Sequence, residues 1–149
     1  MRWSNVPIPE PHIAALAAAA ALHFVLPLRL PVGRRLGAAA GAPMLGAGIG
    51  LAAWAVASAD EADVERESAL VTVGAYALTR NPMYVGWSLA VVGLGLAARS
   101  AWLVATGLLA MTALDREVDA EEARLLRRFG QGYAAYRDRV PRYMLSDPR

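Results

Sequence analysis

The stretch that decides the fold covers residues 37–59 and reads GAAAGAPMLGAGIGLAAWAVASA. It contains no charged residue, and a helix of about 20 apolar residues is long enough to cross the hydrocarbon core of a bilayer. Three further apolar runs cover residues 13–30, 82–98 and 101–114. The run at 13–30 also has the length of a span. The last two runs are shorter and are separated only by Arg99 and Ser100, which indicates a tight helical hairpin. The sequence therefore predicts an all-α integral membrane protein with about four transmembrane helices.

The composition supports a membrane protein and excludes several kinds of chemistry. Of 149 residues, 56% are hydrophobic and 19% are charged, which is more apolar than a typical soluble domain. The absence of cysteine excludes disulfides, thiolate catalysis and cysteine zinc sites. All basic residues are arginines, which excludes a Schiff base and a P-loop, and only two histidines are present. We expect no metal site, and no nucleic-acid partner because the arginines alternate with acids.

Outside the apolar runs, the chain suggests three polar segments. Residues 1–11 contain three prolines and are expected to be irregular or interfacial, and Pro27 and Pro31 are expected to end the first helix. Residues 60–67, with five acids and one arginine, are predicted to be a solvated loop or a helix start. Residues 115–129 lack proline and glycine, so they are predicted to form a C-terminal helical extension outside the membrane.

The arginines predict the orientation in the membrane. With four spans, eleven arginines lie on the side of the N-terminus, the loop 60–82 and the C-terminal tail, and four lie on the opposite side. The positive-inside rule then places both termini and both long polar segments in the cytoplasm, at a bacterial-type plasma membrane. Trp54, Trp87 and Trp102 lie near predicted span ends, which suits an aromatic belt.

Small residues recur at helical spacing in the apolar runs. The pairs Gly37/Gly41 and Gly46/Gly50 have GxxxG spacing and are predicted to be packing faces within the bundle, with homodimerisation as an additional expectation. The segment Gly93 to Ala98 matches a dinucleotide-binding pattern, which needs a preceding strand. Because this segment lies inside an apolar helix, we expect close helix packing instead.

The first segment that carries chemistry covers residues 73–87 and reads VGAYALTRNPMYVGW. Asn81 is a good N-cap type and Pro82 suits the first turn of a helix, so the third helix is predicted to begin here. Its positive dipole end then lies beside Arg80, a combination that attracts a carboxylate or phosphate. An N-cap with an interfacial arginine is the alternative.

The second segment covers residues 115–130 and reads DREVDAEEARLLRRFG. On a helix, Glu117, Glu121, Arg124 and Arg128 share one face. A solvated helix with ion pairs is the alternative for this segment. The tail at 133–143, YAAYRDRVPRY, places aromatic residues among arginines, which fits a segment that returns to the membrane surface.

Together, in this order, the features of residues 71–143 resemble the isoprenylcysteine carboxyl methyltransferase and phospholipid methyltransferase superfamily of integral membrane enzymes. In that family an Arg-His-Pro-x-Tyr-x-Gly segment and a later Glu-Glu pair form the site for S-adenosylmethionine. The matching residues are Arg80, Pro82, Tyr84, Gly86, Glu121 and Glu122. Asn81 replaces the histidine, and Gly74-Ala75-Tyr76-Ala77 stands where the family often has Gly-Pro-Tyr-Arg.

The resemblance implies an S-adenosylmethionine-dependent methyltransferase in a single membrane domain, residues 1–149. Residues 1–59 would form two N-terminal spans and residues 71–143 the cofactor-binding core. The acceptor would be a lipid-like or isoprenyl-type molecule, methylated on a carboxylate or an amine, that enters from the lipid bilayer. The implied catalytic residues are Arg80 and Glu121. The implied cofactor-binding residues are Tyr76, Arg80, Asn81, Pro82, Tyr84, Gly86, Glu121 and Glu122, and the implied substrate residues are Tyr136 and Arg142.

Two other functions stay open. Membrane sterol reductases, which use NADPH, are similar at an Arg-His-Pro-Asn-Tyr segment followed by Gly-Glu. Here Met83 and Trp87 stand where the asparagine and the glutamate would be, which favours methyl transfer. A non-enzymatic small helical membrane protein is the other alternative, and it predicts that Arg80, Glu121 and Glu122 are replaceable.

Overall fold

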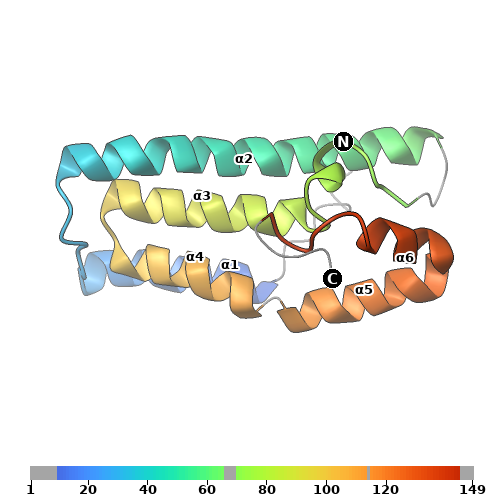
Figure 1. Ribbon diagram of the computed structural model, residues 1–149. Helices are drawn as coiled ribbons and strands as arrows, with labels where there is room; N and C mark the ends of the chain where they lie inside the picture. The colour runs from blue at the N-terminus through green and yellow to red at the C-terminus, as the bar shows by residue number, and fades with distance from the viewer. Residues whose placement is uncertain (1–9, 66–69, 114, 145–149) are drawn as a thin grey trace. The chain divides into compact units, whose positions relative to one another are not determined.

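The computed structural model describes residues 10–65, 70–113 and 115–144, and helices joined by short turns and irregular segments make up this part of the chain (Figure 1). The elements are α1 (Glu10–Val25), α2 (Arg34–Glu65), the 3-10 helix η2 (Gly74–Ala77), α3 (Pro82–Ala98), α4 (Ala101–Ala113), α5 (Asp115–Phe129) and α6 (Gln131–Arg137). Across these residues there is no strand, and the β-type pairing consists of one isolated antiparallel bridge between Arg29 and Ser100. The prediction of an all-α protein is confirmed.

The described residues divide into two compact units. Residues 10–50 and 86–112 form the first, which we call the bundle unit. Residues 51–65, 70–85, 113 and 115–144 belong to the second, which we call the pocket unit. Helices α2 and α3 each contribute residues to both units.

One described helix meets the length and hydropathy needed to cross a membrane. It is the part of α2 from Arg34 to Ala59, and three further apolar helices are shorter: Ile13–Val25, Pro82–Ala98 and Ala101–Ala110. Helix α1 ends at Val25, earlier than the apolar run at 13–30 suggested. Leu26 precedes Pro27, a position that disfavours the helical conformation. The following backbone then pairs with the α3–α4 turn, where Leu30 N–H donates to the Arg99 carbonyl at 2.9 Å.

Two of the expected polar segments differ from the structure or lie partly outside it. Residues 60–65 continue α2 as its last turns, so the prediction of a loop or helix start is wrong for them. Residues 66 and 67 lie outside the described residues, as do 1–9 of the proline-rich N-terminal segment.

Helix α2 contains Pro43 in its interior.

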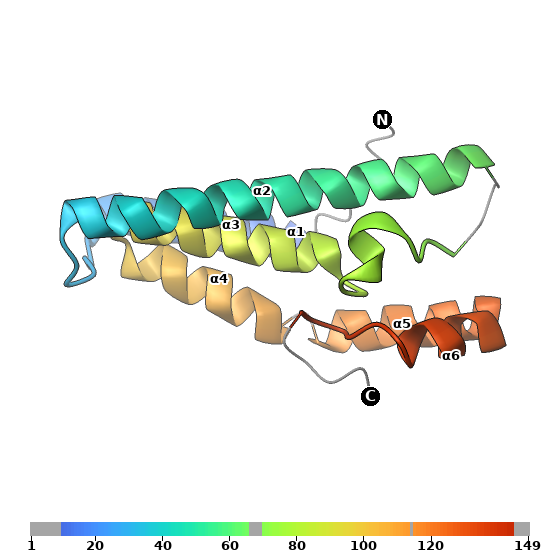
Figure 2. The same ribbon diagram turned by 45° about the horizontal axis from the view of Figure 1, so that its top comes forward.

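Helices α2 and α3 pack backbone against backbone in the bundle unit (Figures 1 and 2). A Cβ on Gly41 would overlap the backbone of Gly93 and Ala97, and a Cβ on Gly93 would overlap that of Leu45. The packing roles predicted for Gly41 and Gly93 are therefore confirmed. A Cβ on Gly46 or Gly50 would meet no described atom within 4 Å, so the expected packing within the bundle is wrong for this second pair.

The predicted hairpin between α3 and α4 is confirmed, with two residues in the turn. Arg99 adopts a positive φ of 57°, and Ser100 N–H donates to the Gly95 carbonyl at 2.7 Å, the long bond of a Schellman helix end. The Ser100 side chain is fully buried, and its Oγ accepts the Leu103 N–H at 3.4 Å. One serine therefore ends α3 and caps α4.

In the pocket unit, α5 has the predicted bounds. Acids in its first turn and Arg127 and Arg128 in its last turn match the helix dipole. Gly130, with φ of 53°, reverses the chain, and α6 lies beside α5 in both ribbon views (Figures 1 and 2). Tyr133 and Tyr136 form a buried core with Val140, against which Leu70, Leu125 and Phe129 pack.

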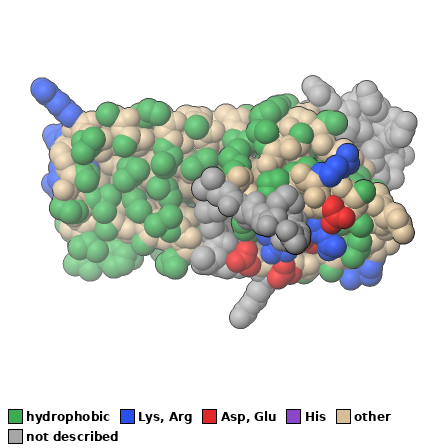
Figure 3. Space-filling view, viewed as in Figure 1, with side chains coloured by type: hydrophobic (Ala, Val, Ile, Leu, Met, Phe, Trp, Pro, Cys, Tyr) green, Lys and Arg blue, Asp and Glu red, His purple; other side chains and the backbone are tan. Residues whose placement is uncertain are grey.

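The face shown in Figure 3 differs between the two units. Hydrophobic side chains cover the helices of the bundle unit, whereas acidic and arginine side chains gather over the pocket unit. The polar chemistry therefore lies in the pocket unit.

Candidate functional site

Helix α2 anchors the short helix η2, which carries Tyr76. Ser58 Oγ accepts the Ala75 N–H at 3.2 Å and donates to the Trp54 carbonyl at 2.8 Å. Gly74 lies against Ser58 with φ of 61°, and a Cβ at this position would overlap Ser58 Oγ. From the other side, the Tyr136 hydroxyl donates to the Tyr76 carbonyl at 2.7 Å. The backbone around Tyr76 is therefore held by two separate elements.

Next to Tyr76 the pocket unit contains a partly open cavity of about 200 Å³. Its polar wall comes from η2, from the turn before α3 and from α5, and its apolar wall comes from α5, α6 and the residues before η2. The lining residues are Leu70, Val71, Tyr76, Arg80, Asn81, Val118, Glu121, Glu122, Leu125, Phe129, Tyr133 and Tyr136. Two chain segments about 40 residues apart in sequence thus meet at one cavity.

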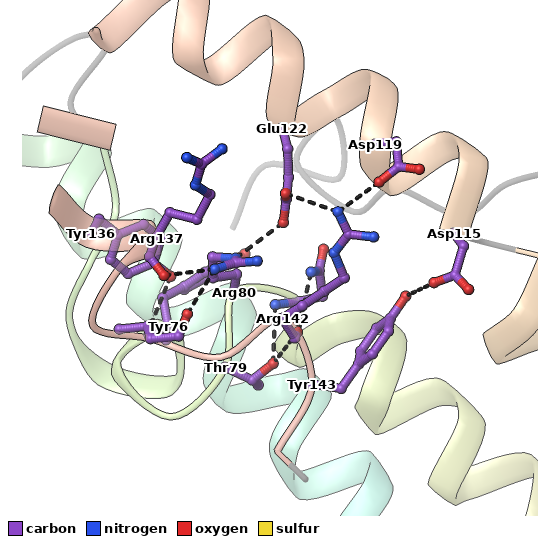
Figure 4. Close-up of polar contacts among 12 residues, drawn as sticks. Tyr76, Thr79, Arg80, Asp115, Asp119, Glu122, Tyr136, Arg137, Arg142 and Tyr143 are labelled. Atoms are coloured by element: carbon purple, nitrogen blue, oxygen red, sulfur yellow. Dashed lines mark hydrogen bonds and ion pairs between the residues drawn. The ribbon is translucent and has the colours of Figure 1, made fainter. Parts of the chain in front are cut away.

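Arg80 is the buried cation of this cavity. Only 5% of its side chain is exposed, and its Nε donates to Glu122 Oε1 at 3.0 Å. Its Nη1 donates to the carbonyls of Arg137 at 2.8 Å and Val140 at 2.9 Å (Figure 4). Arg80 therefore connects α5 to the C-terminal segment, in addition to lining the cavity.

Glu122 joins a second arginine on its other oxygen. Arg142 Nη2 donates to Glu122 Oε2 at 3.0 Å and to Asp119 Oδ1 at 2.6 Å. The Glu122 side chain is 13% exposed and that of Asp119 is 63% exposed. The buried part of this network is therefore Arg80 with Glu122, whereas Arg142 is 26% exposed and Asp119 adds to the network from the surface.

The segment after α6 is tied to the turn before α3. Thr79, which is fully buried, donates through Oγ1 to the Arg142 carbonyl at 2.6 Å, and the Asn81 amide donates to the same carbonyl at 3.2 Å. The Arg80 N–H donates to the Pro141 carbonyl at 2.9 Å. Tyr143 then donates to Asp115 at 2.8 Å (Figure 4). Residues 137–143 therefore form a strap that is bound to both walls of the cavity.

The surroundings of the cavity raise the pKa values of several lining groups. Burial raises the pKa of Glu121, Arg124 lowers it and Glu122 raises it, and the net direction is upward. Burial likewise raises the pKa of Tyr76, with a contribution from Glu121, and raises that of Tyr133 to about 12. The tyrosines stay protonated at neutral pH, and Glu121 gains a proton at a higher pH than an ordinary glutamate.

The structure brings most of the sequence-predicted site residues together. Six of them line the cavity: Tyr76, Arg80, Asn81, Glu121, Glu122 and Tyr136. Arg142 bonds Glu122. Asn81 occupies the predicted N-cap position, because its carbonyl accepts the Val85 N–H at 3.1 Å. Arg142 and three others do not line the cavity: Pro82, which is fully buried, Tyr84, which is half-buried, and Gly86, whose carbonyl lies where Gly48 of α2 approaches α3.

Sequence reasoning missed the apolar wall and the helix face that carries it. Val118, Glu122, Leu125 and Phe129 line the cavity and repeat at spacings of four, three and four, as one face of a helix does. The face selected from the sequence, through Glu117 and Arg124, is displaced by one residue. The sequence signal that indicates this face is an apolar stripe with a single acidic residue, Glu122, within it.

A family model for phospholipid methyltransferases matches residues 37–132. The chain belongs to the phospholipid methyltransferase family. The resemblance inferred from residues 71–143 is thereby confirmed, and the match begins further toward the N-terminus, in α2. Neither the curated proteins nor the solved structures give a match.

Membership in the phospholipid methyltransferase family implies methyltransferase activity at a membrane. The matched region contains Arg80, Glu121 and Glu122 and ends before Tyr136 and Arg142. The strap therefore lies beyond the part of the chain by which this member of the phospholipid methyltransferase family is recognised.

Proposed function

We propose that the protein is an integral membrane enzyme that uses S-adenosylmethionine to methylate a lipid-like or isoprenyl-type acceptor. One observation carries the proposal: residues from the Arg80 segment and from the glutamate pair of α5 line a single cavity. The family match supports methyl transfer, and it leaves an NADPH-dependent reductase or a non-enzymatic role with less support.

The donor groups of the cavity fit the cofactor. S-adenosylmethionine carries a sulfonium, an ammonium, a carboxylate and ribose hydroxyls, and it supplies an electrophilic methyl group when bound. Glu121 suits the cationic groups or the hydroxyls, and the rings of Tyr76 and Tyr136 can face a cation. Arg80 contributes the positive charge expected for a carboxylate. The apolar wall at Val118 and Leu125 suits the flat surface of a nucleobase.

The reaction depends mainly on the alignment of the methyl donor with the acceptor. A methyl transfer is an in-line displacement without a covalent enzyme intermediate, so the lack of cysteine and lysine is no obstacle. Correct positioning of two reactants supplies several kcal/mol of barrier lowering. A carboxylate acceptor needs no base. An amine acceptor must lose a proton, and Glu121 is the group that would accept it.

For the membrane placement, we propose that the apolar segments of α1, α2, α3 and α4 lie in the bilayer. The 17 residues of α3 extend about 25 Å at 1.5 Å per residue, close to the thickness of the hydrocarbon core. The arginine distribution supports a cytoplasmic site and cytoplasmic termini in a bacterial-type plasma membrane. The lipophilic acceptor would enter from the bilayer. The open glycines Gly46 and Gly50 are where homodimerisation would occur.

Thermal unfolding of the detergent-purified chain with S-adenosylhomocysteine tests the cofactor, with NADPH as the comparison. A ligand at 100 times its Kd stabilises the folded state by about 2.7 kcal/mol. We expect stabilisation by the homocysteine compound alone, and a loss of at least about tenfold in its affinity in Glu121→Gln. Glu117→Gln, one turn before Glu121 on the same helix face and outside the cavity lining, is the matched control. Stabilisation by NADPH alone would support the reductase instead.

A further inference from the structure

Adjacent glutamates on α5 have different surroundings. Both carboxylate oxygens of Glu122 are engaged, Oε1 by Arg80 and Oε2 by Arg142, at 3.0 Å each. Among the described residues, no hydrogen bond or ion pair engages Glu121, which also lines the cavity. The pair therefore presents one carboxylate that is already bound by the protein and one that is available to a ligand.

The two arginines come from different segments of the pocket unit. Arg80 lies in the turn before α3, and Arg142 lies in the strap, residues 137–143. Glu122 is the point on α5 at which both meet, as Figure 4 shows. We call these three residues the clasp. It joins α5 to the turn and to the strap at the same time.

We propose that Glu122 and Arg142 are positioning residues, which hold the strap and the turn against α5, and that Glu121 is the glutamate that contacts the cofactor. This inference rests on the proposed function. A cofactor group bound at Glu122 would have to displace an arginine from a largely buried ion pair. Loss of one partner of such a pair leaves an uncompensated charge, which is strongly unfavourable. Glu121 offers its carboxylate without that cost.

The competing assignment is that both glutamates bind the cofactor and that Arg142 contacts the acceptor. The two assignments differ in how substitutions combine. If Glu122 acts by holding the strap through Arg142, removal of Arg142 already undoes that contribution, while the ion pair between Glu122 and Arg80 stays in place. If Glu122 touches the cofactor itself, the two substitutions impair binding independently and their effects multiply.

A double-mutant cycle on the full chain in detergent separates them, with the Kd of S-adenosylhomocysteine measured by isothermal titration. We expect Glu122→Gln and Arg142→Met each to raise the Kd about tenfold, and the double variant to stay within about twofold of the weaker single variant. Glu121→Gln combined with Arg142→Met should instead multiply the two single effects. Multiplication in the cycle of Glu122 and Arg142 would overturn the proposal.

Hydrogen–deuterium exchange of the strap provides a readout that needs no ligand. Glu122→Gln and Arg142→Met should both accelerate exchange in residues 137–143, for example at the Val140 N–H that donates to the Tyr136 carbonyl. Glu121→Gln and the control Glu117→Gln should leave it unchanged. Equal acceleration by Glu121→Gln would contradict the clasp. If the unsubstituted chain binds no S-adenosylhomocysteine, the proposed function fails, and the exchange data still decide whether the clasp exists.

Discussion

Substitution of Gly74 by alanine tests how tightly the cavity is anchored to α2. Gly74 has a φ of 61°, where a residue with a side chain costs about 1–2 kcal/mol. The added Cβ would also overlap Ser58 Oγ, the acceptor of the Ala75 N–H. Displacement of that hydroxyl leaves a buried N–H without its acceptor, which costs about 1–3 kcal/mol. Gly74→Ala should therefore destabilise the folded state by about 2–5 kcal/mol.

Gly130 is a comparison without the side-chain overlap. It has φ of 53° and ψ of −125°, and a Cβ there would meet no described atom within 4 Å. Gly130→Ala should therefore show only the backbone cost. Addition of Ser58→Ala to Gly74→Ala removes the overlapping hydroxyl, so the double variant should be no less stable than Gly74→Ala alone.

Thermal unfolding in detergent, followed by circular dichroism, measures these differences. Each kcal/mol corresponds to about 2–4 °C for a chain of this size. The affinity for S-adenosylhomocysteine should also fall in Gly74→Ala, because Tyr76 lies two residues further along η2. The reasoning would be refuted if Gly74→Ala were as stable as the unsubstituted chain, or if the Ser58 and Gly74 effects simply added.

Two further predictions concern Glu121 and the glycines of α2. The pKa of Glu121 is raised above its ordinary value of 4.5, so the affinity for S-adenosylhomocysteine should fall as the pH drops through that raised pKa. In Glu121→Gln this dependence of the affinity on pH should disappear. A raised carboxyl pKa stabilises the fold below pH 4.5 and this contribution is lost as the pH rises, so ligand-free Glu121→Gln should melt at the same or a higher temperature at pH 7. Gly41→Ala should melt several degrees lower, because its Cβ overlaps the α3 backbone, whereas Gly46→Ala, with open space, should match or exceed the parent because alanine favours a helix by about 1 kcal/mol.

Much of the helix layout was predictable because its signals are local. The bounds of α3 and α5 follow from Pro82 at a first turn and from the run without proline or glycine that ends before Gly130. Residues 60–65 were mispredicted because their acidic side chains indicate exposure to solvent but do not distinguish the last turns of a long helix from a loop. The end of α1 at Val25 is set by Pro27 and by backbone pairing with a turn about 70 residues away.

The sequence by itself determined the all-helical fold, the family and the residue types of the site, because apolar runs, caps and ordered motifs are read along one chain. The tertiary structure alone decided which of those residues meet. Whether Glu121 or Glu122 is bound by arginines depends on the rotation of α5, and one residue of helix turns a side chain by about 100°. The strap is likewise held by hydrogen bonds to residues 57–63 positions away, for which no local pattern exists.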